Sequence, residues 1–135
     1  MKTKIKYAMA ALALALVAAC GGGSDSAQPL SAAQPLYGAI AINPNSVLTM
    51  GITSDQPTEN DAIFRAEINC GSGCKVQRVF VTPNKCGAIA YDTGQRISAW
   101  GVGATSNEAE NAALLSCRNG GGNFCSLYSS RCNIQ

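Results

Sequence analysis

Histidine is absent from the 135 residues of this sequence. The absence excludes the Ser-His-Asp and Cys-His nucleophile systems and removes the most common general base of enzymes. Charged residues are few, at 13%, so the surviving enzymatic route is a carboxylate pair, as in glycosidases. The candidate acids do not suit it: Glu108 and Glu110 point to different sides of a predicted helix, and Asp92 falls in a predicted turn, where solvation is expected. We expect no catalytic residues and no enzymatic activity.

The N-terminal segment accounts for the apparent basicity of the chain. Lys2, Lys4 and Lys6 precede about 12 apolar residues that end in small side chains. This pattern predicts a secretory signal peptide over residues 1–19. A retained membrane anchor is the alternative, but the stretch is shorter than the roughly 20 residues that a transmembrane helix needs. Without this segment, seven basic residues remain against eight acidic ones, so nucleic-acid binding loses its electrostatic driving force.

The residues around the predicted cleavage site carry a more specific signal. Val17, Ala18 and Ala19 stand before Cys20, an order that resembles the lipobox of bacterial lipoproteins. The resemblance implies that Cys20 receives lipid, including acyl chains such as palmitate, and becomes the first residue of the mature chain. Several acyl chains on one residue would hold the protein firmly in a membrane. Gly21 follows, where lipoproteins of the inner membrane often carry Asp, so the resemblance favours the outer membrane, facing the periplasm. An ordinary signal peptide with a chance cysteine is the alternative.

Behind Cys20, residues 20–36 are rich in Gly, Ser, Ala, Gln and Pro and have no hydrophobic periodicity. This composition predicts a flexible tether. The globular domain is then expected over residues 37–135.

The domain contains an internal repeat, marked by GAIA at residues 38–41 and again at 87–90. Turn residues follow each copy, and then come strand-like runs at 47–53 and 96–103. Thr58 and Thr105 each precede an acidic residue by three positions, which predicts two capped helices. Further apolar runs follow at 76–81 and 127–130. The sequence therefore predicts an α+β fold of two tandem β-β-α-β repeats, with one antiparallel sheet packed by two helices.

Seven cysteines are present, and lipid on Cys20 would leave six in an exported domain, which suits three disulfides. The repeat places two pairs at equivalent positions, each joining a helix end to the next strand, and the remaining two cysteines would close the domain. A zinc site is the alternative, but it would need four reduced thiolates outside the cytoplasm, so we expect no metal. The expected pairs are Cys70 with Cys74, Cys117 with Cys125, and Cys86 with Cys132.

Trp100 is the single tryptophan and lies in the middle of a predicted strand. Two interpretations stay open. The side chain packs in the core beside the second helix, or it anchors a binding surface, since tryptophan combines a large apolar ring with one polar N–H group. Trp100 is therefore the candidate residue for a binding surface.

The segment from Tyr37 to Cys132 resembles a family of exported bacterial proteins known as domain of unknown function 4189. The resemblance rests on YGAIA, on the alanine-rich helix that ends in Cys70, on CGAIAYD, on AWGVGATSNEAENAALLSC and on the last two cysteines. The family has no established catalytic residues, so the resemblance implies no site. The first repeat has Met50 near the place of Trp100, which weakens the idea of two equivalent binding sites.

Together these features favour a non-enzymatic interaction module of the cell envelope that binds a protein or an envelope polymer. One specific form is an immunity or inhibitor lipoprotein that captures a toxin in the periplasm. The alternatives are a carboxylate-dependent hydrolase of cell wall or other glycans, and a passive structural lipoprotein. No cofactor is expected.

Overall fold

The computed structural model describes residues 33–134. The predicted signal peptide, the lipid site at Cys20 and most of the predicted tether lie outside these residues. No helix in the described part is long and apolar enough to cross a bilayer. The elements, in chain order, are β1 (Tyr37–Ile42), β2 (Met50–Gln56), α1 (Glu59–Cys70), β3 (Lys75–Phe80), β4 (Cys86–Asp92), β5 (Ile97–Gly103), α2 (Ser106–Asn119) and β6 (Ser126–Cys132).

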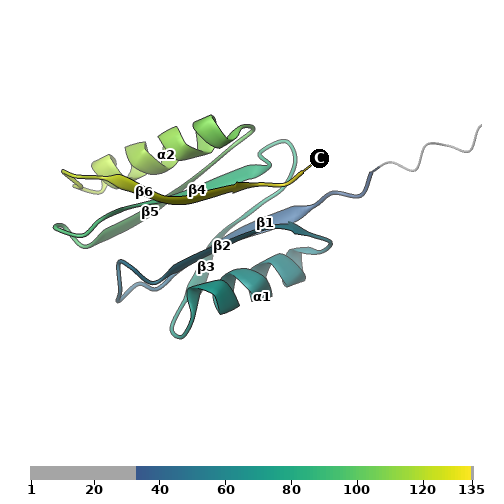
Figure 1. The fold of residues 1–135 in the computed structure, drawn as a ribbon, viewed down its shortest axis with the longest axis horizontal. Coiled ribbons are helices and arrows are strands. Elements are labelled where there is room, and N and C mark those ends of the chain that lie inside the picture. The colour runs from purple at the N-terminus through teal and green to yellow at the C-terminus, as the bar shows by residue number, and fades with distance from the viewer. Residues whose placement is uncertain (1–32, 135) are drawn as a thin grey trace, which may run out of the picture. The chain divides into compact units, whose positions relative to one another are not determined.

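The strands form two antiparallel sheets of three strands each, in the orders β2-β1-β3 and β5-β4-β6 (Figure 1). The α+β prediction is confirmed. The prediction of one sheet is wrong, because each GAIA strand is the centre of its own sheet and its neighbours come from the same half of the chain. Helix α1 packs on the first sheet and α2 on the second, and the two sheets face each other between the helices.

The alternation of alanine and isoleucine in β1 explains this layering. Ala39 and Ala41 lie on the face that packs against α1, and Ile40 and Ile42 lie on the face that packs against the other sheet. Successive side chains of a strand point to opposite faces, so both faces of β1 are apolar and both are buried. β4 repeats the arrangement, with Ala88 and Ala90 toward α2 and Ile89 between the sheets.

Two glycines let the helices lie close to their sheets. A Cβ atom on Gly51 would collide with the backbone of α1, and one on Gly101 would collide with the backbone of α2 at Ala109 and Ala113. Alanine at the facing helix positions keeps these contacts short. Each helix can approach its sheet closely because the strand has no side chain at the glycine that faces the helix backbone.

Phe80 occupies the space between the two sheets. Its ring lies where a Cβ atom of Gly38 or of Gly87 would be, and 2% of its surface is exposed. The GAIA glycines are therefore the positions that make room for one ring. That ring contacts the central strand of each sheet.

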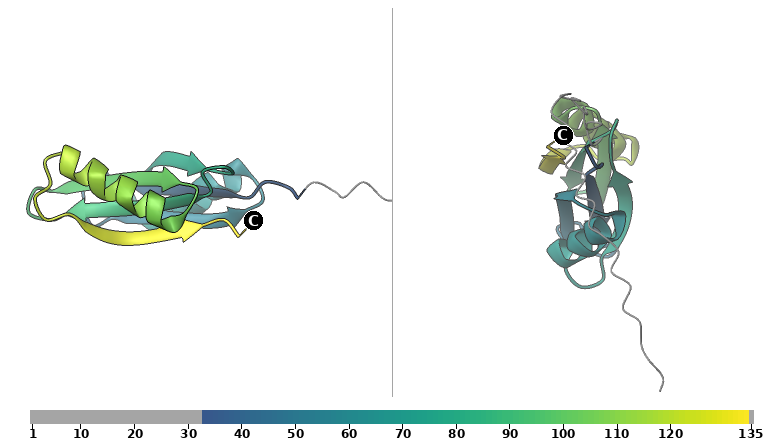
Figure 2. Two further views of the ribbon diagram at one scale, coloured as in Figure 1. Left: turned by 90° about the horizontal axis from the view of Figure 1, so that it is seen from above. Right: turned by 90° about the vertical axis from the view of Figure 1, so that its right-hand side faces the viewer.

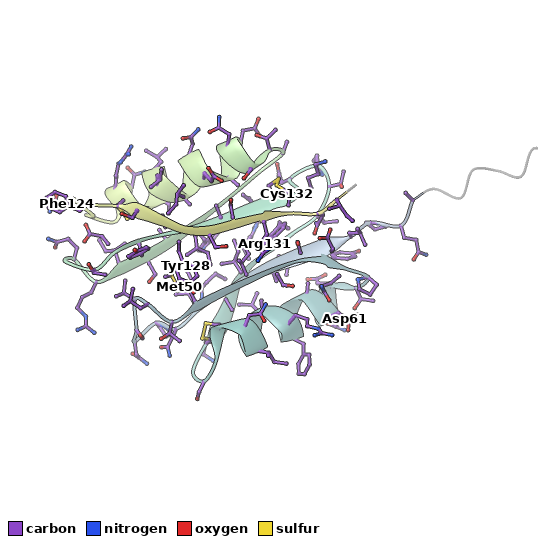
Figure 3. The ribbon with its side chains drawn as sticks, in the orientation of Figure 1. Met50, Asp61, Phe124, Tyr128, Arg131 and Cys132 are labelled. Atoms are coloured by element: carbon purple, nitrogen blue, oxygen red, sulfur yellow. A yellow bond between two sulfur atoms is a disulfide. The ribbon has the colours of Figure 1, made fainter. Side chains whose placement is uncertain are left out.

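The helix caps agree with the sequence prediction. Thr58 Oγ1 accepts a hydrogen bond from the amide of Asp61 at 3.1 Å, and Thr105 Oγ1 accepts one from Glu108 at 3.2 Å. Asp61 lies in the first turn of α1 (Figure 3), where a negative charge suits the helix dipole. The predicted strand at 47–53 begins too early, because residues 47–49 belong to the loop and β2 starts at Met50.

The structure contains the three expected disulfides: Cys70–Cys74, Cys117–Cys125 and Cys86–Cys132. The first two join the end of a helix to the loop or strand that follows it. The third joins β4 to the end of β6, where Cys132 lies (Figure 3).

Both ends of the domain lie together. Asn133 is buried and its Nδ2 donates to the carbonyl oxygen of Leu36 at 2.7 Å, while its Oδ1 accepts from the amide of Asp55 at 2.8 Å. Figure 2 shows the start of β1 and the end of β6 at this same end of the domain. The chain therefore enters and leaves the fold at one end, and the β1–β2 and β4–β5 turns lie at the other.

Candidate functional site

A groove of about 710 Å³ opens at the end of the domain far from the chain ends. Its walls come from the β1–β2 loop at residues 43–47, from Gln77 of β3, from residues 96–100 and from the C-terminal part of α2. Volumes of this size are typical of ligand sites. The groove is the candidate functional site of the domain.

Arg96 and the first four residues of β5 contribute five consecutive residues to the groove wall, up to Trp100. Neighbouring side chains of a strand point to opposite faces. A wall made of consecutive residues therefore follows the edge of the strand and not one of its faces. β5 is an edge strand of its sheet, so the groove runs along its free edge.

The β1–β2 loop forms an ordered wall. Asn43 donates from Nδ2 to the carbonyl oxygen of Ser72 at 3.1 Å, and its Oδ1 accepts from the amide of Asn45 at 2.8 Å. Across the groove, Ser98 Oγ donates to the carbonyl oxygen of Val47 at 3.2 Å. The Ser98 bond holds the loop against β5, and the two Asn43 bonds fix its shape and join it to the loop before β3.

Trp100 is half-buried on β5. It packs against the apolar cluster between the sheets, and it also lines the groove. The expectation that it packs beside the second helix is wrong, because its neighbours Ala99 and Gly101 occupy the face toward α2. The Arg78 guanidinium lies over the ring, 5.9 Å from its centroid.

The charge of the groove is positive. Arg96 is exposed, and its side chain has no hydrogen bond or ion pair within residues 33–134. Its backbone has φ of 55°, in the left-handed region that arginine seldom adopts. No carboxylate of the described residues lines the groove. The site is therefore suited to a ligand that carries negative charge.

The acids singled out in the sequence serve the fold. Glu110 Oε1 accepts hydrogen bonds from Ser130 Oγ at 2.6 Å and from Ser106 Oγ at 2.8 Å. These two bonds, Ser130 first, lower the pKa of the Glu110 carboxyl from its ordinary value of 4.5. Glu108 caps α2 by accepting from the amide of Ala104. A carboxyl group with a lowered pKa has no proton to donate at neutral pH and is a weak base, so Glu110 is poorly suited to act as a general acid or base.

The expectation that Asp92 is a solvated turn residue is wrong. It is buried, and its Oδ2 accepts hydrogen bonds from the amides of Phe124 at 2.7 Å and Asn123 at 2.8 Å. These bonds join the end of β4 to the loop before β6. Within the described residues, no group of three His, Cys, Asp or Glu side chains is placed to hold a metal ion.

Sequence reasoning found Trp100 but missed the rest of the groove. Asn43, Asn45 and Ser46 read as ordinary turn residues, and Arg96 as a residue at the start of a strand. Nothing in their spacing indicates that they meet, because the contacts depend on how the two sheets face each other. The sequence held one signal of the groove, which is that residues 97–103, the strand beside it, carry no charge.

Comparisons with known proteins agree with this structure. A sequence model of the family described as Domain of unknown function (DUF4189) matches residues 37–132. The chain is also similar to the NMR structure of Rv1813c from Mycobacterium tuberculosis, with a TM-score of 0.53 and 24% identity over 95% of this chain and 100% of that chain. This likeness shows a shared fold alone. No curated protein matches the sequence.

The family match runs from the first residue of β1 to the last residue of β6 and includes all three disulfides and the strand beside the groove. It confirms the resemblance that the GAIA strands and the cysteines indicated. The chain belongs to the DUF4189 family.

Proposed function

We propose that this protein is a non-enzymatic binding module of the bacterial cell envelope and that its partner binds in the groove beside β5. The observation that carries the proposal is the groove itself, which is ordered, of ligand size and free of carboxylates among its described lining residues. Glu108 caps a helix, Asp92 anchors a loop, and Glu110 accepts hydrogen bonds from two serines.

The position of the groove fits a tethered protein. The lipid on Cys20 and the tether over residues 20–36 would hold the chain to the periplasmic face of the outer membrane. The tether joins the domain at Leu36, while the groove begins at the far end of β1, about 20 Å away along six strand residues. The site would lie at the end of the domain opposite to Leu36, where partners in the periplasm, such as a toxin to be captured, could reach it.

We also propose that the two halves are tandem copies of one β-β-α-β unit. Two equivalences support this: the GAIA strands at the sheet centres and the capping residues Thr58 and Thr105. The copies differ at the position of Trp100. Trp100 pairs with Ile89 in β4, and the residue that pairs with the matching Ile40 in β1 is Ile52 and not Met50, so the expectation from the sequence is wrong. One copy would therefore have specialised for binding while the other kept the apolar side chain.

The facing edges of the sheets show the same asymmetry. On one side β2 contacts β6, with Met50 and Tyr128 on the strands that face each other (Figure 3). On the other side Gln77 of β3 and the start of β5 form walls of the groove. The groove beside β5 would thus take its walls from one side of the sheet pair alone.

Photo-crosslinking in living cells tests the proposal. The full chain would carry a photoreactive amino acid in place of Gln77, which is exposed on the groove wall, or in place of Arg65, which is exposed on α1. We expect light-dependent adducts of defined mass from position 77 and none from position 65. The same adducts from both positions, or none from position 77, would contradict the groove as the binding site. Release of soluble fragments from purified cell wall by the full chain would contradict a non-enzymatic role.

A further inference from the structure

We propose that the groove takes an extended, acidic peptide segment of a partner protein, which pairs with the free edge of β5 as an added strand. This inference rests on the proposed function, since it assumes that the groove is the binding site. It adds the chemical class of the partner and the way in which that partner is held.

The first argument is the character of the edge. Each sheet has two edge strands, and three of the four carry a charge: Asp55 in β2, Lys75 and Arg78 in β3, and Arg131 in β6. β5, with the sequence ISAWGVG, carries none. Proteins commonly place charges on edge strands to prevent pairing with other chains. An uncharged edge is the arrangement that permits such pairing.

The second argument is access. Residues 96–100 line the groove in succession, so the first half of the β5 edge is open to a ligand. The rest of the strand lies close under α2, where Gly101 and Gly103 face the helix backbone. Strand addition uses unpaired backbone N–H and C=O groups for affinity and pockets for alternate side chains for specificity. Here the half-buried Trp100 ring offers an apolar contact for such a side chain.

The third argument is charge. Arg96 stands immediately before β5, and its guanidinium has no partner among residues 33–134. Arg78 lies over the ring of Trp100, which lines the groove. An arginine with no partner can bind a carboxylate through two parallel hydrogen bonds. A second copy of this chain would bring another uncharged β5 and another Arg96, so it would leave the positive charge uncompensated. An acidic partner strand compensates it.

The position of the Arg78 guanidinium also favours a peptide over a sugar as the ligand. It already lies over the Trp100 ring, so a sugar ring stacked on this face would have to displace it. A strand paired with the edge of β5 leaves Arg78 and Trp100 in place.

The test uses the full chain in detergent and a fluorescent, capped octapeptide of alternating valine and glutamate. The matched probes are the same peptide with lysine for glutamate, and the same peptide with N-methylated valines that cannot donate hydrogen bonds. We expect saturable binding of the glutamate peptide and at least tenfold weaker binding of both controls. Amide hydrogen exchange at residues 97–100 should slow only with the glutamate peptide.

The variant Arg96→Gly separates binding from folding. Glycine adopts positive φ without strain, so the thermal midpoint should stay within a few degrees of the wild-type value. The loss of the guanidinium should weaken binding of the glutamate peptide at least tenfold. The affinity of Arg96→Lys for this peptide should lie between those of the wild type and of Arg96→Gly. Arg65→Gln, which removes a charge from the exposed face of α1, should change neither measurement.

Four outcomes would overturn the inference: equal binding of the glutamate and lysine peptides, no binding of either, a concentration-dependent dimer through β5 in sedimentation, or binding of an N-acetylglucosamine tetrasaccharide that Arg96→Gly leaves unchanged. In each case crosslinking from position 77 would still report on the proposed function. If position 77 gives no adduct and no probe binds, the proposed function fails as well.

Discussion

Asp92 is a single buried carboxylate that connects two parts of the chain about thirty residues apart. It accepts hydrogen bonds from the amides of Phe124, Gln95 and Asn123, and these bonds, with Phe124 contributing most, lower its pKa from the ordinary value of 3.8. As the pH falls, the unfolded chain therefore binds a proton before the folded chain does. The stabilisation is complete well above pH 3.8 and is lost as the pH falls through the folded-state pKa.

We expect Asp92→Asn to lower the thermal midpoint by several degrees at pH 7, because an amide offers one acceptor oxygen and places an N–H group against the amides that Asp92 binds. The difference from the wild type should shrink as the pH is lowered from about 5 toward 2, since protonation removes the same interaction from the wild type. Thermal unfolding followed by circular dichroism across this range measures it.

Glu67→Gln is the control, because it removes one negative charge from an exposed position on α1. Its unfolding curve should follow the wild type at every pH. A difference between Asp92→Asn and the wild type that stays constant down to pH 2 would show that the carboxylate charge is not the source of the stabilisation.

At the scale of elements, the sequence predicted what local chemistry determines. Thr58 and Thr105 mark the helix starts because a hydroxyl at the N-cap satisfies an amide three residues on, and this depends on nearby residues alone. Two disulfides followed from the repeat, since each joins cysteines close in the sequence, and Cys86–Cys132 followed as the remaining pair. The assignment of strands to two sheets was missed, since pairing depends on contacts between distant segments.

One signal in the sequence did contain information on the two sheets. β1 alternates alanine with isoleucine and has no polar position after Tyr37. A strand with one solvent-exposed face would show polar residues at every second position. The apolar GAIA segments of β1 and β4 therefore indicate strands covered on both faces, by a helix on one and a sheet on the other.

The contact between each helix and its glycine strand makes a second prediction. Gly101→Ala should reduce the free energy of unfolding by about 3 kcal/mol, because the added methyl group would collide with backbone atoms of α2, which cannot move aside as a side chain can. Gly51→Ala should have a similar effect through α1. Urea denaturation measures both, with unchanged slopes expected.

Gly120→Ala serves as the comparison. Its φ of −76° suits any residue, and a Cβ atom there meets its neighbours at 3.4 Å or more. The midpoint of its urea denaturation should stay close to the wild-type value. If Gly101→Ala proved equally mild, the helix would have to be free to move away from the strand, and the close packing of α2 would not stabilise the fold.

At the scale of the whole domain, the two halves depend on each other through the space between the sheets. The sequence indicated each half, but it could not show the surface that forms where they meet. The groove, like the buried ring of Phe80, exists only because two sheets face each other. Residues such as Asn45 and Arg96 acquire a common site from this arrangement, and no pattern within either half reports it.

Phe80 makes this dependence measurable. It is the last residue of β3, yet its ring fits over a glycine in each central strand, Gly38 and Gly87. Phe80→Ala should reduce the free energy of unfolding by about 4 kcal/mol through lost burial and the cavity left behind. Phe64→Ala on the outer face of α1, where the ring is 61% exposed, should change it by less than about 0.5 kcal/mol.

Hydrogen exchange on the Phe80→Ala variant distinguishes a shared core from two independent ones. If the ring joins the halves into one cooperative unit, amides of β1 and of β4 should lose protection to the same extent, although Phe80 belongs to the first sheet alone. Loss confined to β1, β2 and β3 would mean that the second half folds without the first. In that case the groove, whose walls come from both halves, would open and close with the first half, and mutations at Phe80 would alter binding without unfolding β5.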